Sequence, residues 1–288
     1  MHSRFIKIIR MGELEVLDIQ HPKFTAKIAL QGAQLFHFQA NGKAPLIWLS
    51  STAQFKSGTS LRGGIPICWP WFGVWNKNPE VLTQQSHEDK GSHGFARHKL
   101  WHLENYKESA QKVDLKLSYT HKADDAWPFD CKVECHFILD HTLSLNLTTE
   151  NLDRNAMWFS QAAHTYFPTP DIRRTHILCK GRQTYVDALD DWKVKPQNGA
   201  IHFSQEVDRI YQGQGDYWLT TPEKQIQVQS NSQSSVIWNP WIEKSKLLSQ
   251  FSAEDYLTML CIESANVLED AVSLQPKETH TLSITYRD

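Results

Sequence analysis

The sequence lacks most features that place a chain in a membrane, on nucleic acid or outside the cell. It nowhere contains eighteen consecutive apolar residues, so we expect no membrane-spanning helix. The N-terminal segment MHSRFIKIIRMGELEVLD has neither the long apolar stretch nor the small-residue cleavage site of a secretory signal. The formal net charge of −2 provides no long-range attraction for nucleic acid or anionic lipid. We therefore expect neither partner, and a cytoplasmic location.

Cysteine is scarce and irregularly placed, which argues against a disulfide framework. The five cysteines form an odd and scattered set: Cys68, Cys131, Cys135, Cys179 and Cys261. Cys131 and Cys135 share one face of an expected strand, where four residues span about 13 Å, too far for a disulfide. We expect small buried thiols and a reducing compartment.

Helical periodicity is also scarce, and alternation of apolar and polar residues takes its place. The alternation predicts strands over residues 114–121, 131–140, 141–150, 225–230, 234–239 and 280–287, with a hairpin at Asp140–His141. A capping signal at 252–257 allows only a turn or two of helix. No repeat or linker interrupts the chain, so the pattern favours one all-β sandwich domain over residues 1–288.

Aromatic residues, by contrast, are abundant: eleven Trp, thirteen Phe and eight Tyr. Most should pack in the core, but LRGGIPICWPWFG (61–73) places Arg62 and two glycines beside several of them. The glycines would let the backbone approach a ligand, with Arg62 supplying the charge. The wall of the site would come from Trp69, Trp71, Phe72 and Trp75. The alternative is a packed loop whose arginine makes ordinary surface contacts.

Two titratable side chains are candidates for proton transfer. Glu263 follows Leu257, Met259 and Cys261 on one face of the strand YLTMLCIESAN (256–266). It lies either at the exposed end of that strand or on a cleft floor, where burial would raise its proton affinity. His164, in SQAAHTYFPTP (160–170), is either a packed strand histidine or a proton donor suited to neutral pH.

Other segments supply binding candidates. HEDKGSHGFARHKLWH (87–102) contains several histidines with Glu88 and Asp89, but their spacing matches no metal-ligand pattern, and we expect no metal. HGFAR indicates a turn at Gly94 leading into a strand that presents Arg97, which could converge with Arg62 on a phosphate or carboxylate. Asp208 in VDRIYQG is either a surface ion-pair residue or a hydroxyl acceptor, and Trp238 lies in the aromatic turn of WNPW.

Taken together, LRGGIPICWPWFG, HGFAR, AAHTYF, VDRIY, WNPW and CIESANV, in this order over residues 61–267, resemble the glucose-6-phosphate 1-epimerase branch of the aldose 1-epimerase family. The resemblance implies a galactose-mutarotase-like β-sandwich that acts on a sugar without a cofactor or metal, as a monomer. It implies His164 as catalytic acid, Glu263 as catalytic base, Arg62 and Arg97 as phosphate ligands and Asp208 as a hydroxyl ligand.

The same resemblance places Ser92, His93 and Trp238 in the substrate site. Some relatives have a glutamine at the Ser92 position, and the segment 86–91 is longer than the expected connection. The function implied is interconversion of the α and β anomers of glucose 6-phosphate and related hexose 6-phosphates. The alternatives are a non-catalytic sugar-phosphate sensor and an epimerase of unphosphorylated hexoses; a glycoside hydrolase would require two apposed carboxylates.

Overall fold

The computed structural model describes residues 3–86, 91–181 and 184–288, and confirms the all-β expectation. The helical elements are short: α1 (Glu80–Thr83), α2 (Trp241–Ser245) and the 3₁₀ turns η1 (Trp75–Lys77), η2 (Ala96–His98), η3 (Ile172–Arg174), η4 (Asp255–Leu257) and η5 (Leu268–Asp270). Among the helices of the described residues, none is long and apolar enough to cross a bilayer. All five cysteines are thiols rather than disulfides.

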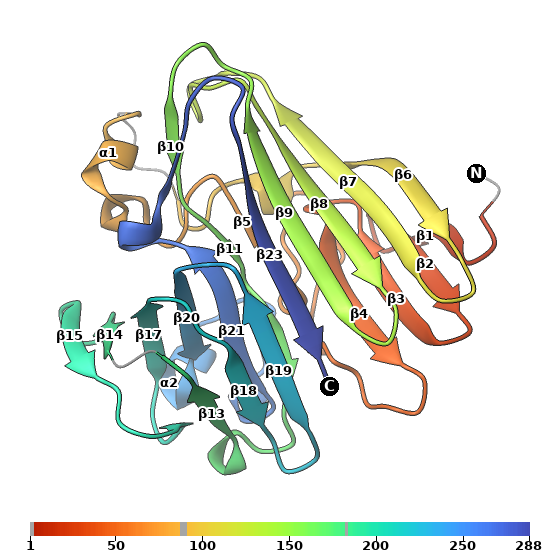
Figure 1. Ribbon diagram of the computed structural model, residues 1–288. Helices are drawn as coiled ribbons and strands as arrows, with labels where there is room; N and C mark the ends of the chain where they lie inside the picture. The colour runs from red at the N-terminus through yellow and green to blue at the C-terminus, as the bar shows by residue number, and fades with distance from the viewer. Residues whose placement is uncertain (1–2, 87–90, 182–183) are drawn as a thin grey trace.

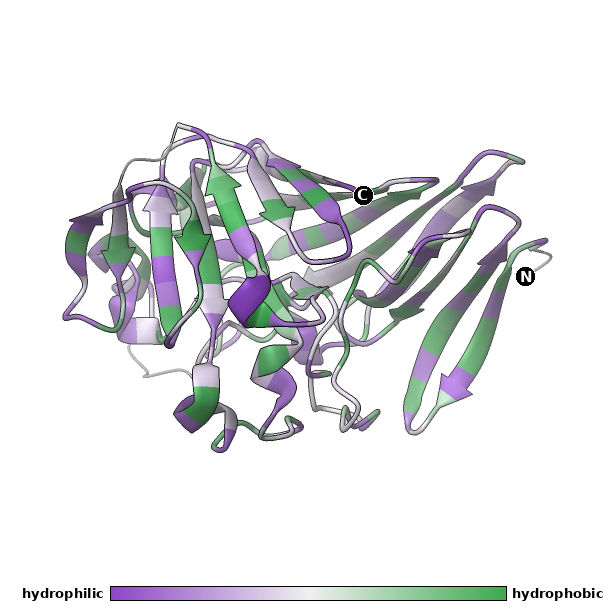
Figure 2. Ribbon diagram, turned by 90° about the horizontal axis from the view of Figure 1, so that it is seen from below, coloured by the Kyte–Doolittle hydropathy of each residue, from purple (hydrophilic) through white to green (hydrophobic). Residues whose placement is uncertain are grey.

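The largest sheet has nine antiparallel strands. Their order is β16 (Ile201–His202), β13 (His176–Cys179), β18 (Tyr217–Thr220), β19 (Gln225–Ser230), β23 (Thr279–Arg287), β9 (Leu143–Asn151), β8 (Cys131–Leu139), β7 (Val113–His121) and β6 (His102–Glu108). Each expected strand over 114–150, 225–230 and 280–287 lies in this sheet. The β8–β9 hairpin turns over residues 140–142, because Leu139 pairs with Leu143. Strict alternation in β8 and β9 buries one face of each strand. Alternating bands of hydrophilic and hydrophobic colour run along many strands of the molecule in Figure 2.

The second large sheet, also antiparallel, has eight strands. Its order is β15 (Lys193–Pro196), β14 (Thr184–Asp187), β17 (Val207–Gln212), β20 (Ser234–Asn239), β21 (Met259–Asn266), β11 (Gln161–Ala163) and β5 (Ile67–Cys68), with β12 (Tyr166–Pro168) also paired to β21. Every residue of β20 and β21 is buried. These central strands are therefore covered on both faces. The strand expected over 256–266 begins only at Met259, because residues 255–257 form the 3₁₀ turn η4.

The two large sheets pack face to face around the main core. Leu145 and Ile284 from the nine-stranded sheet join Ile237 and Ile262 from the eight-stranded sheet in one buried cluster. Two smaller sheets complete the chain: β1 (Ile6–Met11), β2 (Leu14–His21), β3 (Phe24–Ala29) and β4 (Gln34–Ala40) in one, β10 (Met157–Phe159) and β22 (Val272–Leu274) in the other. Figure 1 shows β1–β4, in red to orange, near β6.

A second apolar cluster covers the opposite face of the eight-stranded sheet. It contains Trp48, Tyr166, Trp238 and Cys261 and belongs to the face that carries the candidate site. The four aromatic residues between positions 69 and 75, expected to form the wall of the site, do not all lie there. Trp69, Trp71 and Trp75 are buried in the main core, and only Phe72 packs against the site-side cluster. The expected aromatic wall is thus wrong for the three tryptophans. The rings of Trp69 and Trp71 turn inward against Phe95 and Trp127, and the Trp75 ring packs against Trp71.

The glycines of this region meet backbone instead of open space. A Cβ on Gly63 would lie 2.6 Å from the Trp48 carbonyl oxygen, and one on Gly94 would lie 2.0 Å from the Trp69 carbonyl oxygen. Both glycines have positive φ, which side chains rarely tolerate. The close approach expected at 63–64 therefore serves packing of protein segments against each other.

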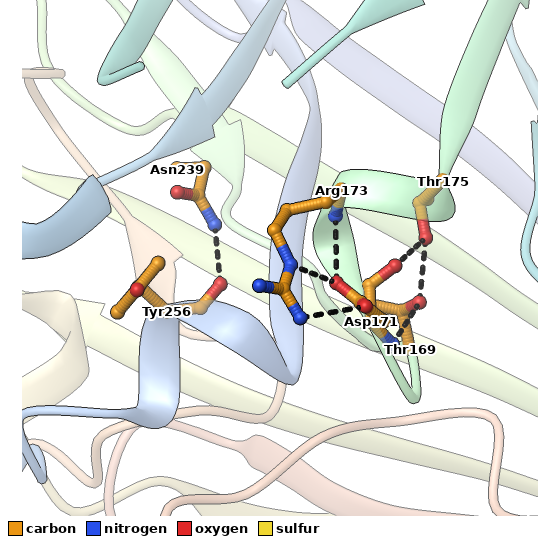
Figure 3. Close-up of polar contacts among 6 residues, drawn as sticks. All are labelled: Thr169, Asp171, Arg173, Thr175, Asn239 and Tyr256. Carbon is orange, nitrogen blue, oxygen red and sulfur yellow. Dashed lines mark hydrogen bonds and ion pairs between the residues drawn. The ribbon is translucent and has the colours of Figure 1, made fainter. Parts of the chain in front are cut away.

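Polar contacts brace the loops that flank the site strands (Figure 3). The Asn239 side chain donates to the Tyr256 carbonyl oxygen at 2.9 Å, which fixes the end of β20 against the η4 turn. After β12, the Asp171 carboxylate accepts from both the backbone N–H and the guanidinium of Arg173. The Thr169 N–H donates to the Thr258 carbonyl oxygen and so ties this loop to the start of β21.

Candidate active site

Strand register assembles one row of candidate residues across the eight-stranded sheet. Asp208 on β17 lies opposite Trp238 on β20, and Trp238 lies opposite Cys261 on β21. On the other side of β21, Tyr166 on β12 lies opposite Cys261. Because side chains directly opposite one another in antiparallel strands point to the same face, the row forms a continuous surface.

The neighbouring row holds the expected acid–base pair. β11 pairs Ala163 with Ser264 and β12 pairs Tyr166 with Cys261. Continuing this register across the short gap between the two strands places His164 opposite Glu263. The His164 Nε2 atom lies 3.3 Å from the Glu263 Oε1 atom. The alternative that Glu263 marks an exposed strand end is wrong, because β21 continues to Asn266 and Glu263 is 1% exposed.

Burial controls the electrostatics of this pair. The Glu263 pKa is raised well above its ordinary value by desolvation, with a further contribution from the Asp208 carboxylate. The His164 pKa is lowered well below its ordinary value by desolvation, then by His93, Arg62 and Arg97. Both shifts favour the uncharged forms of the two side chains, a carboxyl and a neutral imidazole.

The pair also has unused hydrogen-bonding capacity. Within the described residues, neither Glu263 Oε2 nor His164 Nδ1 has a hydrogen-bond partner, although both atoms are buried. The His164 side chain keeps 12% exposure, against 2% for that of Glu263. Buried polar atoms are normally satisfied, so these two atoms are available for further hydrogen bonds.

Aromatic rings surround His164 on several sides. The Tyr166 ring stacks on the imidazole with centroids 4.9 Å apart, and the Trp238 ring meets it edge-on at 6.0 Å. His93 lies edge-on at 5.7 Å, and its other side meets Phe72. Burial lowers the His93 pKa to about 3, so this imidazole is neutral. These contacts fix the orientation of the His164 ring.

Both expected arginines lie near the histidines. Arg62 donates to the Tyr166 hydroxyl at 3.4 Å and to the Ser249 carbonyl oxygen at 3.2 Å. Arg97 donates to the Ser92 carbonyl oxygen at 2.8 Å, and its Nε is buried with no partner in the part of the chain that the structure describes. Both guanidinium groups lower the pKa of His93 and of His164, which shows that they approach the same region.

The setting of Arg97 differs from the expectation. Residues 96–98 form the 3₁₀ turn η2 and not a strand, because Gly94 contacts the Trp69 backbone and redirects the chain. Ser92 is exposed, and its backbone carbonyl holds the Arg97 guanidinium. Residues 87–90, which include most of the long segment at 86–91 and the possible ligands His87, Glu88 and Asp89, lie outside the described residues.

Asp208 is a half-buried carboxylate next to the pair. Desolvation raises its pKa to about 6. It lines a cavity of about 140 Å³ together with Asp187, Lys195 and Arg209. A second cavity of about 370 Å³ is lined by Lys77, Trp158 and Leu268, among others. Neither cavity is lined by His164 or Glu263, and Asp208 is the candidate site residue that lines the smaller one.

An Asp208→Asn substitution is expected to stabilise the fold while weakening function. The unfolded carboxyl ionises near its ordinary pKa of 3.8, whereas the folded one retains its proton up to about pH 6. The folded state therefore binds more protons between these values, and stability falls as pH rises through that window. At pH 7 asparagine should recover at most about 3 kcal/mol, measured by urea unfolding. An unchanged midpoint at pH 7, or an equal gain at pH 4, would contradict this.

Two residues next to the pair were not assigned a role from the sequence. Tyr166 contacts both Arg62 and His164, and the signal that could have found it is its position two residues after His164 on the same face. Cys261 lies two residues before Glu263 on the same face. Its sulfur, His164 and a Glu263 oxygen offer ligand atoms within 4.8 Å of one another, the one such group found in residues 3–86, 91–181 and 184–288.

The fold is shared with sugar epimerases of known structure. The crystal structure of "a putative mutarotase (YeaD)" from Salmonella typhimurium matches with a TM-score of 0.89 at 25% identity, covering 100% of this chain and 94% of that one. The structure of galactose 1-epimerase from Lactobacillus acidophilus NCFM has a TM-score of 0.70 at 13% identity, which shows the same fold. The expected galactose-mutarotase-like β-sandwich is confirmed.

The chain belongs to the aldose 1-epimerase family, whose sequence profile matches residues 15–287. It is therefore an enzyme, an epimerase that acts on sugars. A protein of Escherichia coli (strain K12) named "Putative glucose-6-phosphate 1-epimerase" is 30% identical over 278 residues, covering 94% of this chain and 90% of the relative. A protein of the same name from Cenchrus ciliaris is 32% identical, covering 88% and 78%.

Proposed function

We propose that this enzyme interconverts the α and β anomers of hexose 6-phosphates, with glucose 6-phosphate as its substrate. The observation that carries the proposal is the cross-strand pair of His164 and Glu263, 3.3 Å apart and buried, with two guanidinium groups beside it. The names of the relatives support the choice of substrate. Five thiols support a cytoplasmic location, and we further propose that the protein acts as a monomer.

Anomer exchange requires the sugar ring to open and close again. A base removes the proton from the C1 hydroxyl while an acid protonates the ring oxygen, so that the C1–O5 bond breaks and an aldehyde forms. Rotation about C1–C2 presents the other face, and the two proton transfers then run in reverse. Glu263 is the base and His164 the acid in the opening step. Each positioned transfer contributes about 10²–10⁴-fold.

The electrostatics of the pair fit a shared proton. Opening needs a carboxylate and an imidazolium, whereas burial shifts the balance toward a carboxyl and a neutral imidazole. Both arrangements contain the same number of protons and differ only in the position of one. Transfer between Oε1 and Nε2, over 3.3 Å, interconverts them without exchange with solvent. The proposed substrate atoms would then take up the hydrogen bonds that Glu263 Oε2 and His164 Nδ1 lack among the described residues.

The remaining side chains would hold the sugar phosphate. Arg62 and Arg97 bind the 6-phosphate, which carries about −1.5 to −2 charges near pH 7. Asp208 accepts from a sugar hydroxyl, and Trp238 and His93 border the ring. Fixing the phosphate end orients C1 while leaving it free to rotate.

The test is anomer exchange measured by NMR on glucose 6-phosphate beside glucose, galactose 6-phosphate and mannose 6-phosphate. The rate is taken as the slope against enzyme concentration, which removes the spontaneous reaction. We expect the highest kcat/KM for phosphorylated sugars. Equal values for glucose and glucose 6-phosphate would reject the phosphate specificity, and no slope with any sugar would reject the function.

An Arg62→Ala substitution is expected to raise the KM for glucose 6-phosphate by about 10- to 100-fold, as for the loss of a hydrogen bond to a charged group. The KM for glucose should change little, because glucose has no phosphate. Arg173→Ala is the matched control, since the Arg173 guanidinium is exposed and paired with Asp171. A KM for glucose 6-phosphate that stays at the control value would remove Arg62 from the phosphate site.

A further inference from the structure

Cys261 is a buried thiol beside the catalytic pair that the proposed reaction does not use. It lies on β21 two residues before Glu263 and faces the same side of the sheet. The His164 imidazole, the Cys261 sulfur and a Glu263 oxygen each offer a ligand atom within 4.8 Å of the others. A thiol, an imidazole and a carboxyl therefore converge at the point where the sugar would react.

This donor set suits a thiophilic divalent cation. Zinc sites use sulfur at about 2.3 Å and nitrogen or oxygen at about 2.0–2.2 Å, which places tetrahedral donors roughly 3.3–3.7 Å apart. The 3.3 Å between His164 Nε2 and Glu263 Oε1 already has that spacing. Cys261 Sγ, within 4.8 Å of both, needs to approach by about 1 Å. The fourth position would remain for water.

The unpaired oxygen of Glu263 and the charges of the donor set also favour a thiophilic dication. Glu263 Oε2 is buried without a partner in the described chain, so the carboxylate has an acceptor available. A thiolate and a carboxylate together balance a dication, and this neutrality offsets the cost of burying the charges. Arg62 and Arg97 oppose any cation in this region. Hard cations such as Mg²⁺ gain little from sulfur and should not overcome this repulsion, whereas Zn²⁺ and Cd²⁺ gain a metal–thiolate bond.

We propose that His164, Cys261 and Glu263 form an inhibitory site for a thiophilic divalent cation, Zn²⁺ or Cd²⁺, which competes with the sugar. Binding converts the thiol to a thiolate and the carboxyl to a carboxylate, and the two protons pass to the buffer; no oxidant or reductant takes part. Burial raises the Cys261 pKa well above its ordinary value, so the thiol is protonated before the metal arrives. The inhibition, though not the binding, rests on the proposed function.

The experiment uses Cd²⁺ as the probe, in a Cys179→Ser background that removes the half-buried thiol. Thiolate-to-cadmium absorbance measures metal–sulfur bonding, and calorimetry in buffers of different ionisation enthalpy counts the released protons. Anomer exchange with and without Cd²⁺ measures inhibition for each variant against its own metal-free rate. We expect one Cd²⁺ per chain, about two protons released, and inhibition that glucose 6-phosphate relieves.

Two cysteine variants decide the assignment. Cys261→Ala should remove the absorbance band and raise the Cd²⁺ concentration for half-inhibition at least tenfold. Cys68→Ala is the matched control, because Cys68 is equally buried in the same site-side cluster, and it should behave like the background protein. Equal inhibition in both variants, or no band in the background protein, would overturn the proposal. A band lost with Cys261 in a protein that shows no anomer exchange would uphold the metal site and reject the proposed function.

Discussion

Replacing Glu263 with glutamine is expected to lower kcat for anomer exchange by about 10²–10⁴-fold. The amide keeps the shape of the side chain but cannot take the proton from the C1 hydroxyl. Binding of the sugar phosphate should persist, since Arg62 and Arg97 are unchanged. The measurement is NMR exchange on glucose 6-phosphate, with phosphate-dependent binding followed by calorimetry. Exchange within a few-fold of the unaltered enzyme would reject Glu263 as the base.

The same substitution has a second readout that separates a functional carboxyl from a structural one. The Glu263 pKa is higher in the folded state than in the unfolded state, so the folded protein binds more protons above pH 4.5 and loses stability as pH rises through that window. Glutamine avoids this loss, and Glu263→Gln should melt at a higher temperature at pH 7 but not at pH 4. The exposed Glu254→Gln is the control and should change neither activity nor melting. A lower melting temperature at pH 7 would indicate that Glu263 stabilises the fold.

Local sequence pattern predicts much of this fold. In an antiparallel strand with one buried face, apolar and polar residues alternate, and this alternation can be recognised in the sequence. The strands at 131–139 and 143–151 bury every second residue, as their alternation predicts. The same reasoning places Glu263 and Cys261 on one face of their strand. It cannot say where a strand ends. β21 continues to Asn266, whose buried side chain accepts a hydrogen bond from Gln161 and donates one to Asp270.

What the pattern cannot predict is which strands are neighbours. His164 and Glu263 meet because β11 and β12 both pair with β21 in one register, an arrangement set by contacts between segments about a hundred residues apart. Family resemblance pointed to the pair, but not to Tyr166 stacked on the imidazole. The role of a tryptophan is equally hard to predict from sequence, because its ring packs well both in a hydrophobic core and against a sugar. Only the packing shows that Trp69 faces the core and Trp238 the site.

Replacing His164 with glutamine is the second substitution expected to abolish exchange, again by about 10²–10⁴-fold in kcat. Glutamine can place an N–H near the position of Nε2 and preserve the contact with Glu263, but it cannot deliver a proton to the ring oxygen. His176→Gln, in the nine-stranded sheet, is the control and should leave the rate unchanged. If the His164 variant loses activity only through a raised KM, the imidazole binds the sugar and does not transfer protons.

Combining the two substitutions tests whether the pair acts as a unit. Ring opening needs the base and the acid in the same step, because Glu263 takes the proton of the C1 hydroxyl while His164 gives its own proton to the ring oxygen. Proton exchange between Oε1 and Nε2 across 3.3 Å prepares both groups for that step, so removing either partner removes the shared function. The double variant should therefore be only slightly slower than the slower single variant, as for residues that act together in catalysis. If kcat of the double variant is instead lowered by the product of the two single-variant factors, His164 and Glu263 act independently and no proton is shared between them.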